Sequence, residues 1–293
     1  MRILLTGSRG QVGRHLLARL RERWEVVAWS RAEVDLTDVA AIEAGVRAAG
    51  PDVVINAAAY TAVDRAESEP DLCAAVNATA PAALARAAAA VSATMIHYST
   101  DYVFDGTLDR PYRPDDVPNP LGVYGRTKLD GERAVLDSGV SALVLRTSAV
   151  YDLEGRNFLQ TILGRARAGE PLRVVADQVT CPTYAGDIAD ATVTMLERAG
   201  CRLGESHGLH HVVSRDGASW YDFACAIVTE AGLDATVLVS AIPTSEYPTP
   251  ARRPAWSVLD GSTTAATFDL VMPPWRDALV DAMRRRPSSL RAA

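Results

Sequence analysis

An apolar run, a glycine-rich turn and a helical pattern follow one another at the start of the chain. This arrangement constrains the fold more than any other feature. The residues of the turn that would approach a ligand are Gly7, Arg9, Gly10, Gln11, Val12 and Gly13. In a strand–turn–helix unit of this kind the backbone can approach a pyrophosphate, and the helix N-terminus offers its free N–H groups. The spacing is G-x-x-G-x-x-G rather than G-x-G-x-x-G, but its context predicts a dinucleotide-binding turn.

The next segments alternate between strand-like and helix-like patterns up to about residue 150. Strands are expected at 2–6, 25–29, 52–57, 94–99 and 142–146, and helices follow the turn and recur at 40–49, 81–91 and 124–136. The apolar run 52–57 suits a strand that is buried on both faces. This rhythm predicts an α/β fold with a Rossmann-type, doubly wound parallel sheet over residues 1–150.

After Tyr151 the rhythm changes. Helix-like stretches at 157–168, 186–198 and 220–231 are separated by short strands and proline-rich turns. We expect residues 151–293 to form mainly a smaller, mixed α/β substrate-binding lobe at the carboxyl edge of the sheet. The pattern leaves room for segments of this half that return to the first domain.

Composition narrows the possible partners. The chain has 30 Lys and Arg against 36 Asp and Glu, a formal net charge of -6, which gives no basic surface for nucleic acid. No stretch reaches the roughly 18 apolar residues of a membrane span, and the N-terminus does not resemble a signal peptide. Four cysteines lack C-x-x-C spacing, which argues against a zinc site. A cytoplasmic protein without a membrane partner is expected.

The end of the second expected strand bears on the choice of cofactor. An acidic residue there would bind the ribose of NAD, but the chain has Ser30 and Arg31, with Arg9 nearby in the turn. Two guanidinium groups favour a 2′-phosphate, so NADPH is the predicted cofactor and NADH stays possible. Asp35 and Leu36 are candidates for the adenine pocket. The alternative is that Arg31 is a solvated surface residue.

Three residues could carry carbonyl reduction. Tyr124 and Lys128 lie four residues apart and therefore share one helix face, where an ammonium group would lower the pKa of the phenol. Thr100 ends the preceding strand, and its hydroxyl would point into the cofactor crevice. The alternatives are a solvated helix face for the pair and strand capping for Thr100.

The chain resembles the dTDP-4-dehydrorhamnose reductase family, within the extended short-chain dehydrogenases, over nearly its full length. The matching motifs are GQVG (10–13), NAAAYTAVDRAE (56–67), HYSTDYVFDG (97–106), YGRTK (124–128), LRTS (145–148), GRNF (155–158) and YPTPARRP (247–254). The resemblance implies a two-lobed fold, NAD(P)H, and reduction of the C4 ketone of a dTDP-linked 4-keto-6-deoxyhexose.

The resemblance also implies roles for individual residues. Tyr124 would donate the proton, Lys128 would hold the nicotinamide ribose, and Thr100 would face the carbonyl. The cofactor would further meet Ala57, Ala58, Ala59 and Tyr98. The substrate would meet Thr61, Val63, Asp101 and Tyr102, and its diphosphate would meet Asn157, Arg252 and Arg253. A structural role in the proline-rich turn is an equal alternative for the two arginines.

Two positions depart from the family pattern. Ala149 stands where the family has Trp, which should change the hexose that fits this pocket. His15 stands where some members have a metal-binding Glu, so no metal is expected. Two alternatives therefore stay open, a 4-ketoreductase for a different dTDP-deoxysugar and a non-catalytic NADP-binding regulatory subunit. The chain is expected to be a monomer or a homodimer.

Overall fold

A six-stranded parallel sheet forms the centre of the computed structural model, which describes residues 1–199, 203 and 206–285. Its strands are β1 (Arg2–Thr6), β2 (Glu25–Trp29), β3 (Val53–Asn56), β4 (Thr94–Thr100), β5 (Ala142–Thr147) and β10 (Gly208–His211). They lie in the order β10-β5-β4-β3-β1-β2, and all neighbours are parallel. The predicted doubly wound sheet is confirmed.

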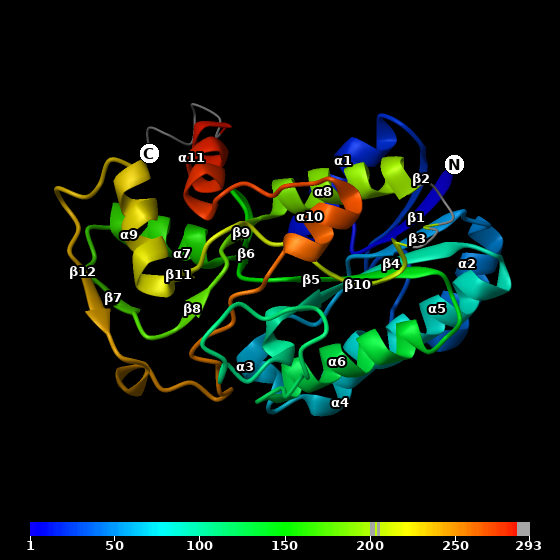
Figure 1. Cartoon of the computed structure of the whole chain (residues 1–293), viewed down its shortest axis with the longest axis horizontal. Helices are drawn as coiled ribbons and strands as arrows, with labels where there is room; N and C mark the ends of the chain where they lie inside the picture. The colour runs from blue at the N-terminus through cyan, green and yellow to red at the C-terminus, as the bar shows by residue number, and fades with distance from the viewer. Residues whose placement is uncertain (200–202, 204–205, 286–293) are drawn as a thin grey trace.

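Helices cover both faces of this sheet (Figure 1). One layer consists of α1 (Gln11–Arg21) and α8 (Ala185–Ala199), and the other of α2 (Val39–Ala49), α5 (Ala80–Ala90) and α6 (Val123–Leu136). Successive strand residues point to opposite faces. Leu5 therefore packs with Leu16 of α1, whereas Leu4 packs with Ile42 of α2. The strands read as apolar runs because both of their faces are buried.

Two segments from the second half of the chain complete this domain. Strand β10 pairs with β5 at the edge of the sheet, and α8 packs along α1. The sheet therefore draws on residues beyond 150, and the boundary between the two parts of the chain stays a prediction.

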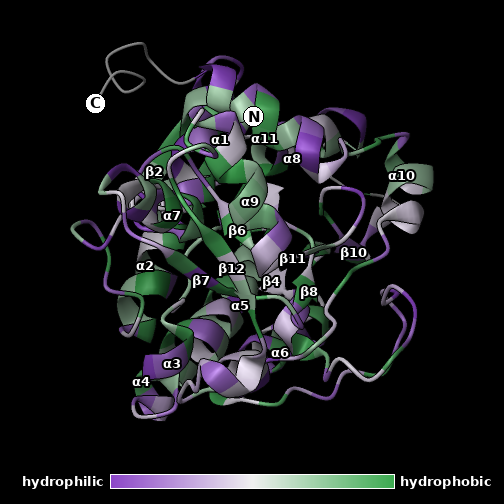
Figure 2. Ribbon diagram, turned by 90° about the vertical axis from the view of Figure 1, so that its left-hand side faces the viewer, coloured by the Kyte–Doolittle hydropathy of each residue, from purple (hydrophilic) through white to green (hydrophobic). Residues whose placement is uncertain are grey.

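The remaining elements include a second lobe with its own core. Helices α7 (Phe158–Arg167) and α9 (Trp220–Glu230) pack against the parallel pair β7 (Leu172–Val175) and β12 (Val239–Ile242), and α11 (Trp275–Arg285) packs against α9. Phe223 lies at the centre of this core and contacts the rings of Tyr151, Phe158 and Trp275. In Figure 2 much of the hydrophilic colour lies on peripheral loops and helix ends, while central strands are largely hydrophobic.

The other elements of the described chain are short. They are α3 (Val63–Ala66), α4 (Pro70–Ala74), the π-helical η1 (Ala75–Thr79), η2 (Asp101–Val103), β6 (Val150–Tyr151), β8 (Val179–Thr180), β9 (Thr183–Tyr184), β11 (Ala218–Ser219), η5 (Thr244–Glu246) and α10 (Ser262–Phe268). Among the described cysteines, Cys73, Cys181 and Cys225 are free thiols. Cys201 lies outside the described residues.

One helical stretch differs from the expectation about membrane spans. Residues 70–90 are long and apolar enough to cross a membrane by length and composition. Half of that window is buried inside the structure, and α5 contributes Leu84 and several alanines to the core beneath the sheet. Its apolar character is thus explained by packing within the fold.

Candidate active site

The glycine turn between β1 and α1 is tightly enclosed. Gly7 has φ +66°, and a Cβ there would lie 2.6 Å from the backbone nitrogen of Ala58. A Cβ on Gly13 would lie 2.1 Å from the carbonyl oxygen of Gly7. The glycine turn therefore lies in close backbone contact with both α1 and the segment after β3.

The start of α1 fits a phosphate-bearing ligand. Gly10 is its N-cap and supplies no side-chain hydrogen bond, and the first turn carries no acidic residue. The N–H groups of Gln11 and Val12 therefore have no side-chain acceptor at the positive end of the helix dipole. Oε1 of Gln11 is also buried without a hydrogen-bond partner within the described part of the chain.

Glu33, in the segment that follows β2, was not named in the sequence analysis. The backbone N–H of Ser30 donates to Oε2 of Glu33 at 2.6 Å. Its hydrogen bonds with Ser30, and secondarily the charge of Arg9, lower the pKa of Glu33. The carboxylate of Glu33 thus competes with a 2′-phosphate for the backbone N–H of Ser30 and for the charge of Arg9. The S-x-x-E spacing typical of a capping box would have indicated it.

Three other residues predicted near the cofactor, Arg31, Asp35 and Leu36, lie in the same segment after β2. The carboxylate of Asp35 accepts hydrogen bonds from the backbone and hydroxyl of Thr37, and its pKa is lowered mainly by these bonds. Leu36 packs against the core below the sheet, and Arg31 is exposed.

Two buried asparagines hold the segment Ala57–Ala59 beside the glycine turn. Oδ1 of Asn56 accepts the N–H of Ala58 at 3.2 Å and the hydroxyl of Thr6 at 2.6 Å. Asn77, in the π-helical η1, accepts the N–H of Tyr60 at 2.8 Å and donates to its carbonyl at 3.1 Å. Sequence reasoning named neither asparagine as a site residue, because both act by holding backbone groups, and the partner of Asn77 is 17 residues away.

Two of the three predicted catalytic residues, Thr100 and Tyr124, are in contact at the carboxyl end of β4, and Lys128 contacts the same strand. Thr100 ends the strand, and its hydroxyl interacts with the phenol of Tyr124 from the first turn of α6. Lys128 is buried, and its Nζ donates to the carbonyl oxygen of Tyr98 at 2.5 Å. The Tyr98 phenol lies on the other face of the sheet, 2.6 Å from the hydroxyl of Thr192 in α8. Only the backbone of Tyr98 therefore faces the site.

Thr100 also has the capping role that was its alternative. Its Oγ1 accepts the N–H of Tyr102 at 3.2 Å and donates to Asp101 at 3.0 Å. A single hydroxyl thus begins η2 and contacts the phenol of Tyr124.

The pKa of Tyr124 is raised in this structure, and Lys128 is not among the causes of its shift. Burial raises the pKa of Tyr124 above its ordinary value, Asp101 adds to this, and the Thr100 hydroxyl opposes it. Burial lowers the pKa of Lys128 to about 8, while Glu132 acts in the opposite direction. The ammonium group is directed at a backbone carbonyl instead of the phenol.

A small cavity beside Tyr124 brings several predicted substrate residues together. It is lined by Val63, Glu67, Tyr102, Leu121, Gly122, Tyr124, Gly125, Ala251, Arg252 and Pro254. The rings of Tyr102 and Tyr124 meet edge to face with centroids 6.0 Å apart. Arg252 is exposed at the rim, whereas Thr61 is exposed just before α3 and is not part of the lining.

Asp101 does not face this cavity with a free carboxylate. It is 2% exposed. Its oxygens accept hydrogen bonds from four hydroxyls, those of Thr100 (3.0 Å), Ser148 (2.8 Å), Thr180 (3.3 Å) and Ser257 (2.6 Å). Asp101 therefore joins four segments of the chain, and its contact with the sugar stays a prediction.

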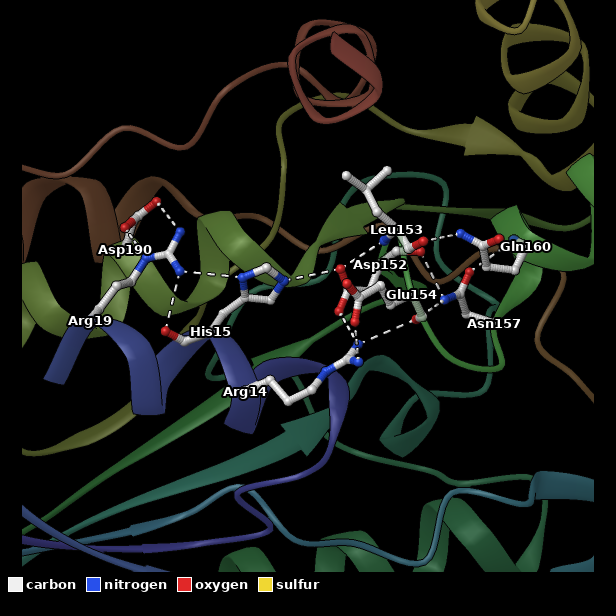
Figure 3. A network of polar contacts seen from close by, with 9 residues as sticks. All are labelled: Arg14, His15, Arg19, Asp152, Leu153, Glu154, Asn157, Gln160 and Asp190. Atoms are coloured by element: carbon white, nitrogen blue, oxygen red, sulfur yellow. Dashed lines mark hydrogen bonds and ion pairs between the residues drawn. The ribbon is translucent and has the colours of Figure 1, made fainter. Parts of the chain in front are cut away.

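Two of the residues expected at the diphosphate also have other partners. Asn157 is the N-cap of α7, accepts the N–H of Gln160 and donates to the carbonyls of Asp152 and Glu154 (Figure 3). Arg253 forms an ion pair with Asp64 at 2.9 Å and interacts with Tyr102. The structural alternative holds for Arg253, and Arg252 is left as the exposed cation.

The two positions that depart from the family pattern are well defined. Ala149, just after β5, is half-buried with φ +42°, a left-handed conformation that favours glycine. Nε2 of His15 lies 3.0 Å from Asp152, which also pairs with Arg14 (Figure 3). Within residues 1–199, 203 and 206–285 no group of three His, Cys, Asp or Glu side chains could hold a metal ion.

Comparison with known proteins agrees with this architecture. Residues 1–287 match the family model described as RmlD substrate binding domain. The dTDP-4-dehydrorhamnose reductase of Burkholderia thailandensis is 43% identical over 290 residues, which cover 95% of this chain and 97% of the relative.

Solved structures give the same result. The Clostridium acetobutylicum dTDP-4-dehydrorhamnose reductase superposes with a TM-score of 0.90 at 36% identity, covering 97% of this chain and 99% of that one. The Bacillus anthracis dTDP-4-dehydrorhamnose reductase, solved in complex with NADP, gives a TM-score of 0.91 at 30% identity with the same coverage. This chain therefore belongs to the dTDP-4-dehydrorhamnose reductase family.

Proposed function

We propose that this protein uses NADPH to reduce the C4 ketone of a dTDP-linked 4-keto-6-deoxyhexose. The observation that carries the proposal is the contact between Thr100 and Tyr124 at the carboxyl end of β4, where Lys128 binds the Tyr98 carbonyl of the same strand. A small cavity with the exposed Arg252 in its lining lies beside Tyr124. The names of the relatives support the substrate class.

The residues around the glycine turn fit the cofactor. The uncapped N-terminus of α1 would hold the pyrophosphate, and Ser30, Arg9 and Arg31 would hold the 2′-phosphate. Ala57–Ala59 and Lys128 would lie along the nicotinamide riboside. When bound, NADPH supplies the hydride that reduces the carbonyl carbon.

Tyr124 holds the proton that the carbonyl oxygen needs. Its raised pKa keeps the phenol protonated throughout the neutral range. Thr100 contacts that phenol through its hydroxyl. Its single proton is donated to Asp101, so a hydrogen bond from Thr100 to the developing oxyanion would require this proton to turn away from Asp101. Lys128, held against the carbonyl oxygen of Tyr98, would act by binding the nicotinamide ribose.

The side chains around the cavity are of the types that a nucleotide-linked sugar would need. Val63 and Tyr102 provide its apolar and aromatic walls, and Arg252 offers a guanidinium to a diphosphate. Thr61 stands outside the lining and would contact the ligand only where it projects from the cavity. Asp101 would act by holding Thr100 and Ser148 in place.

Ala149 favours a second candidate, reduction of a different dTDP-deoxysugar. A methyl group replaces the indole expected from the family, so the pocket has lost an aromatic wall. The absence of that wall weakens selection between the two 5-epimers of the 4-keto-6-deoxyhexose.

An assay with both 5-epimers tests the proposal. We expect NADPH oxidation with the 4-keto sugar of the rhamnose series, and deuterium at C4 of the product when the cofactor carries a transferable deuteride. Turnover of only the unepimerised sugar would support the second candidate. NADPH binding without turnover of either sugar would instead favour a regulatory subunit. A cytoplasmic location and a monomeric or homodimeric state are part of the same proposal.

A further inference from the structure

The helix that carries Tyr124 and Lys128 is capped by a residue from far upstream. Its N-cap, Gly122, has no side chain to bond the first turn. Instead, Oε1 of Glu67 accepts the N–H of Val123 at 2.8 Å across 56 residues of sequence. A carboxylate at this end is also favoured by the helix dipole.

The position of Glu67 links it to the cavity. Glu67 lines the cavity together with Val63 and Tyr124, and it follows directly after α3. Within the described residues Glu67 has no ion-pair partner, so its charge is directed at the helix N-terminus. The amide that it holds belongs to the residue immediately before Tyr124.

Helix α3 is in turn fastened to the second lobe. Asp64 pairs with Arg253 at 2.9 Å and accepts the backbone N–H of Ala251 at 3.3 Å. Arg252, the exposed cation at the cavity rim, lies between these two residues. The segment that would meet the diphosphate is therefore connected through α3 and Glu67 to the first turn of α6.

We propose that Glu67 is a positioning residue for the proton donor, which keeps the first turn of α6 where the Tyr124 phenol meets Thr100. This inference rests on the proposed function for its kinetic consequences. Its structural consequence, a fixed first turn, does not depend on the substrate.

Gly122 provides an independent test of the same contact. Its φ of −129° is open to any residue, so alanine would not strain the backbone. A Cβ at this position would lie 2.7 Å from Oε1 of Glu67 and would push the carboxylate away from the Val123 amide. G122A should therefore act by removing the contribution of Glu67.

Kinetics of E67A, E67Q and a matched surface variant test the proposal. We expect E67A to lower kcat roughly 10- to 100-fold, because small displacements of a reacting group are costly, with the Kd for NADPH within about twofold of wild type. E67Q retains an oxygen acceptor and should recover most of kcat. E43A on α2, which removes an exposed ion pair with Arg86 of α5, should change neither value. Loss of thermal stability in E67A with an unchanged kcat would overturn the proposal.

A double-mutant cycle with hydrogen exchange separates this inference from the proposed function. Exchange of the amides in residues 121–128 should rise in E67A and in G122A, and the double variant should match E67A alone. Additive effects, or unchanged exchange in E67A, would refute the role of Glu67. Should wild-type protein reduce neither sugar epimer, the proposed function fails, while the exchange cycle still decides the positioning role.

Discussion

Lys128 shows how far a single residue can differ from what its sequence position implies. Its place four residues after Tyr124 predicts a charge beside a phenol, but its ammonium group bonds the Tyr98 carbonyl inside the protein. Desolvation then lowers the pKa of Lys128 to about 8. Because the pKa of Tyr124 is raised, Lys128 is the first of the two to lose its proton as pH rises.

The pH profile of kcat/KM should therefore fall on the alkaline side with an apparent pKa near 8, since this parameter reports groups of the free enzyme. K128R keeps a positive charge at all these pH values, so its residual activity should be flat across the same range. If the alkaline decrease in kcat/KM persists in K128R, a group other than Lys128 causes it.

The lowered pKa of Lys128 also predicts that the free energy of unfolding rises with pH, whereas kcat/KM falls. Between about 8 and the ordinary lysine value, the unfolded chain binds the Lys128 proton and the folded chain does not. The free energy of unfolding should therefore rise with pH in this window, relative to K128M. Urea titrations of both proteins at the two ends of the window measure the difference, and parallel trends would contradict the lowered pKa.

Glu33 is a second single residue with a predicted effect, here on the choice between NADPH and NADH. Its carboxylate takes the Ser30 amide and lies in the field of Arg9, so it competes with a 2′-phosphate for the same groups. We expect E33Q to raise the ratio of kcat/KM for NADPH over NADH roughly fivefold. E25Q, at the other end of β2, is the control. An unchanged ratio would show that Glu33 only caps its own turn.

Secondary-structure elements were the part most readily predicted from the sequence. The expected helix from residue 124 begins at Val123, and the strand at 142–146 ends at Thr147. These boundaries follow from local patterns of apolar residues and glycine. The Glu67 cap of α6 could not be predicted in the same way, because its donor and acceptor are brought together only by the tertiary fold.

For Asn157, a local sequence pattern describes the observed contacts better than the family motif does. A family motif suggested a ligand contact, but a local rule, Asn as N-cap three residues before Gln160, describes what it does. We expect N157A to lower the free energy of unfolding by about 1 kcal/mol, with KM for the dTDP-sugar unchanged. N157D, which keeps the acceptor oxygen, should lose less. A large rise in KM with unchanged stability would restore the ligand role.

At the level of the whole molecule, the two lobes share buried polar contacts that no linear pattern reveals. The carboxylate of Asp101 follows β4 and binds hydroxyls from three later segments, at Ser148, Thr180 and Ser257. Each of these is an ordinary residue in its own sequence context. The return of β10 and α8 to the large sheet depends on tertiary packing in the same way.

Removal of this junction should be costly. D101A leaves four buried hydroxyls without their shared acceptor, and we expect it to lower the free energy of unfolding by roughly 2 to 4 kcal/mol. D101N keeps the shape and one acceptor, so its loss should be smaller. Chemical denaturation provides the measurement, and a D101A variant as stable as wild type would show that Asp101 does not hold the lobes together.

The most direct test of the account is the turnover of Y124F with a dTDP-4-keto-6-deoxyhexose that wild-type protein reduces, measured alongside the Kd for NADPH. Removal of one hydroxyl leaves the helix and the cofactor residues intact but deprives the carbonyl oxygen of its proton. We expect kcat to fall by a factor on the order of hundreds or more, with an unchanged Kd for NADPH. Turnover at the wild-type rate would contradict the assignment of Tyr124 as the proton donor.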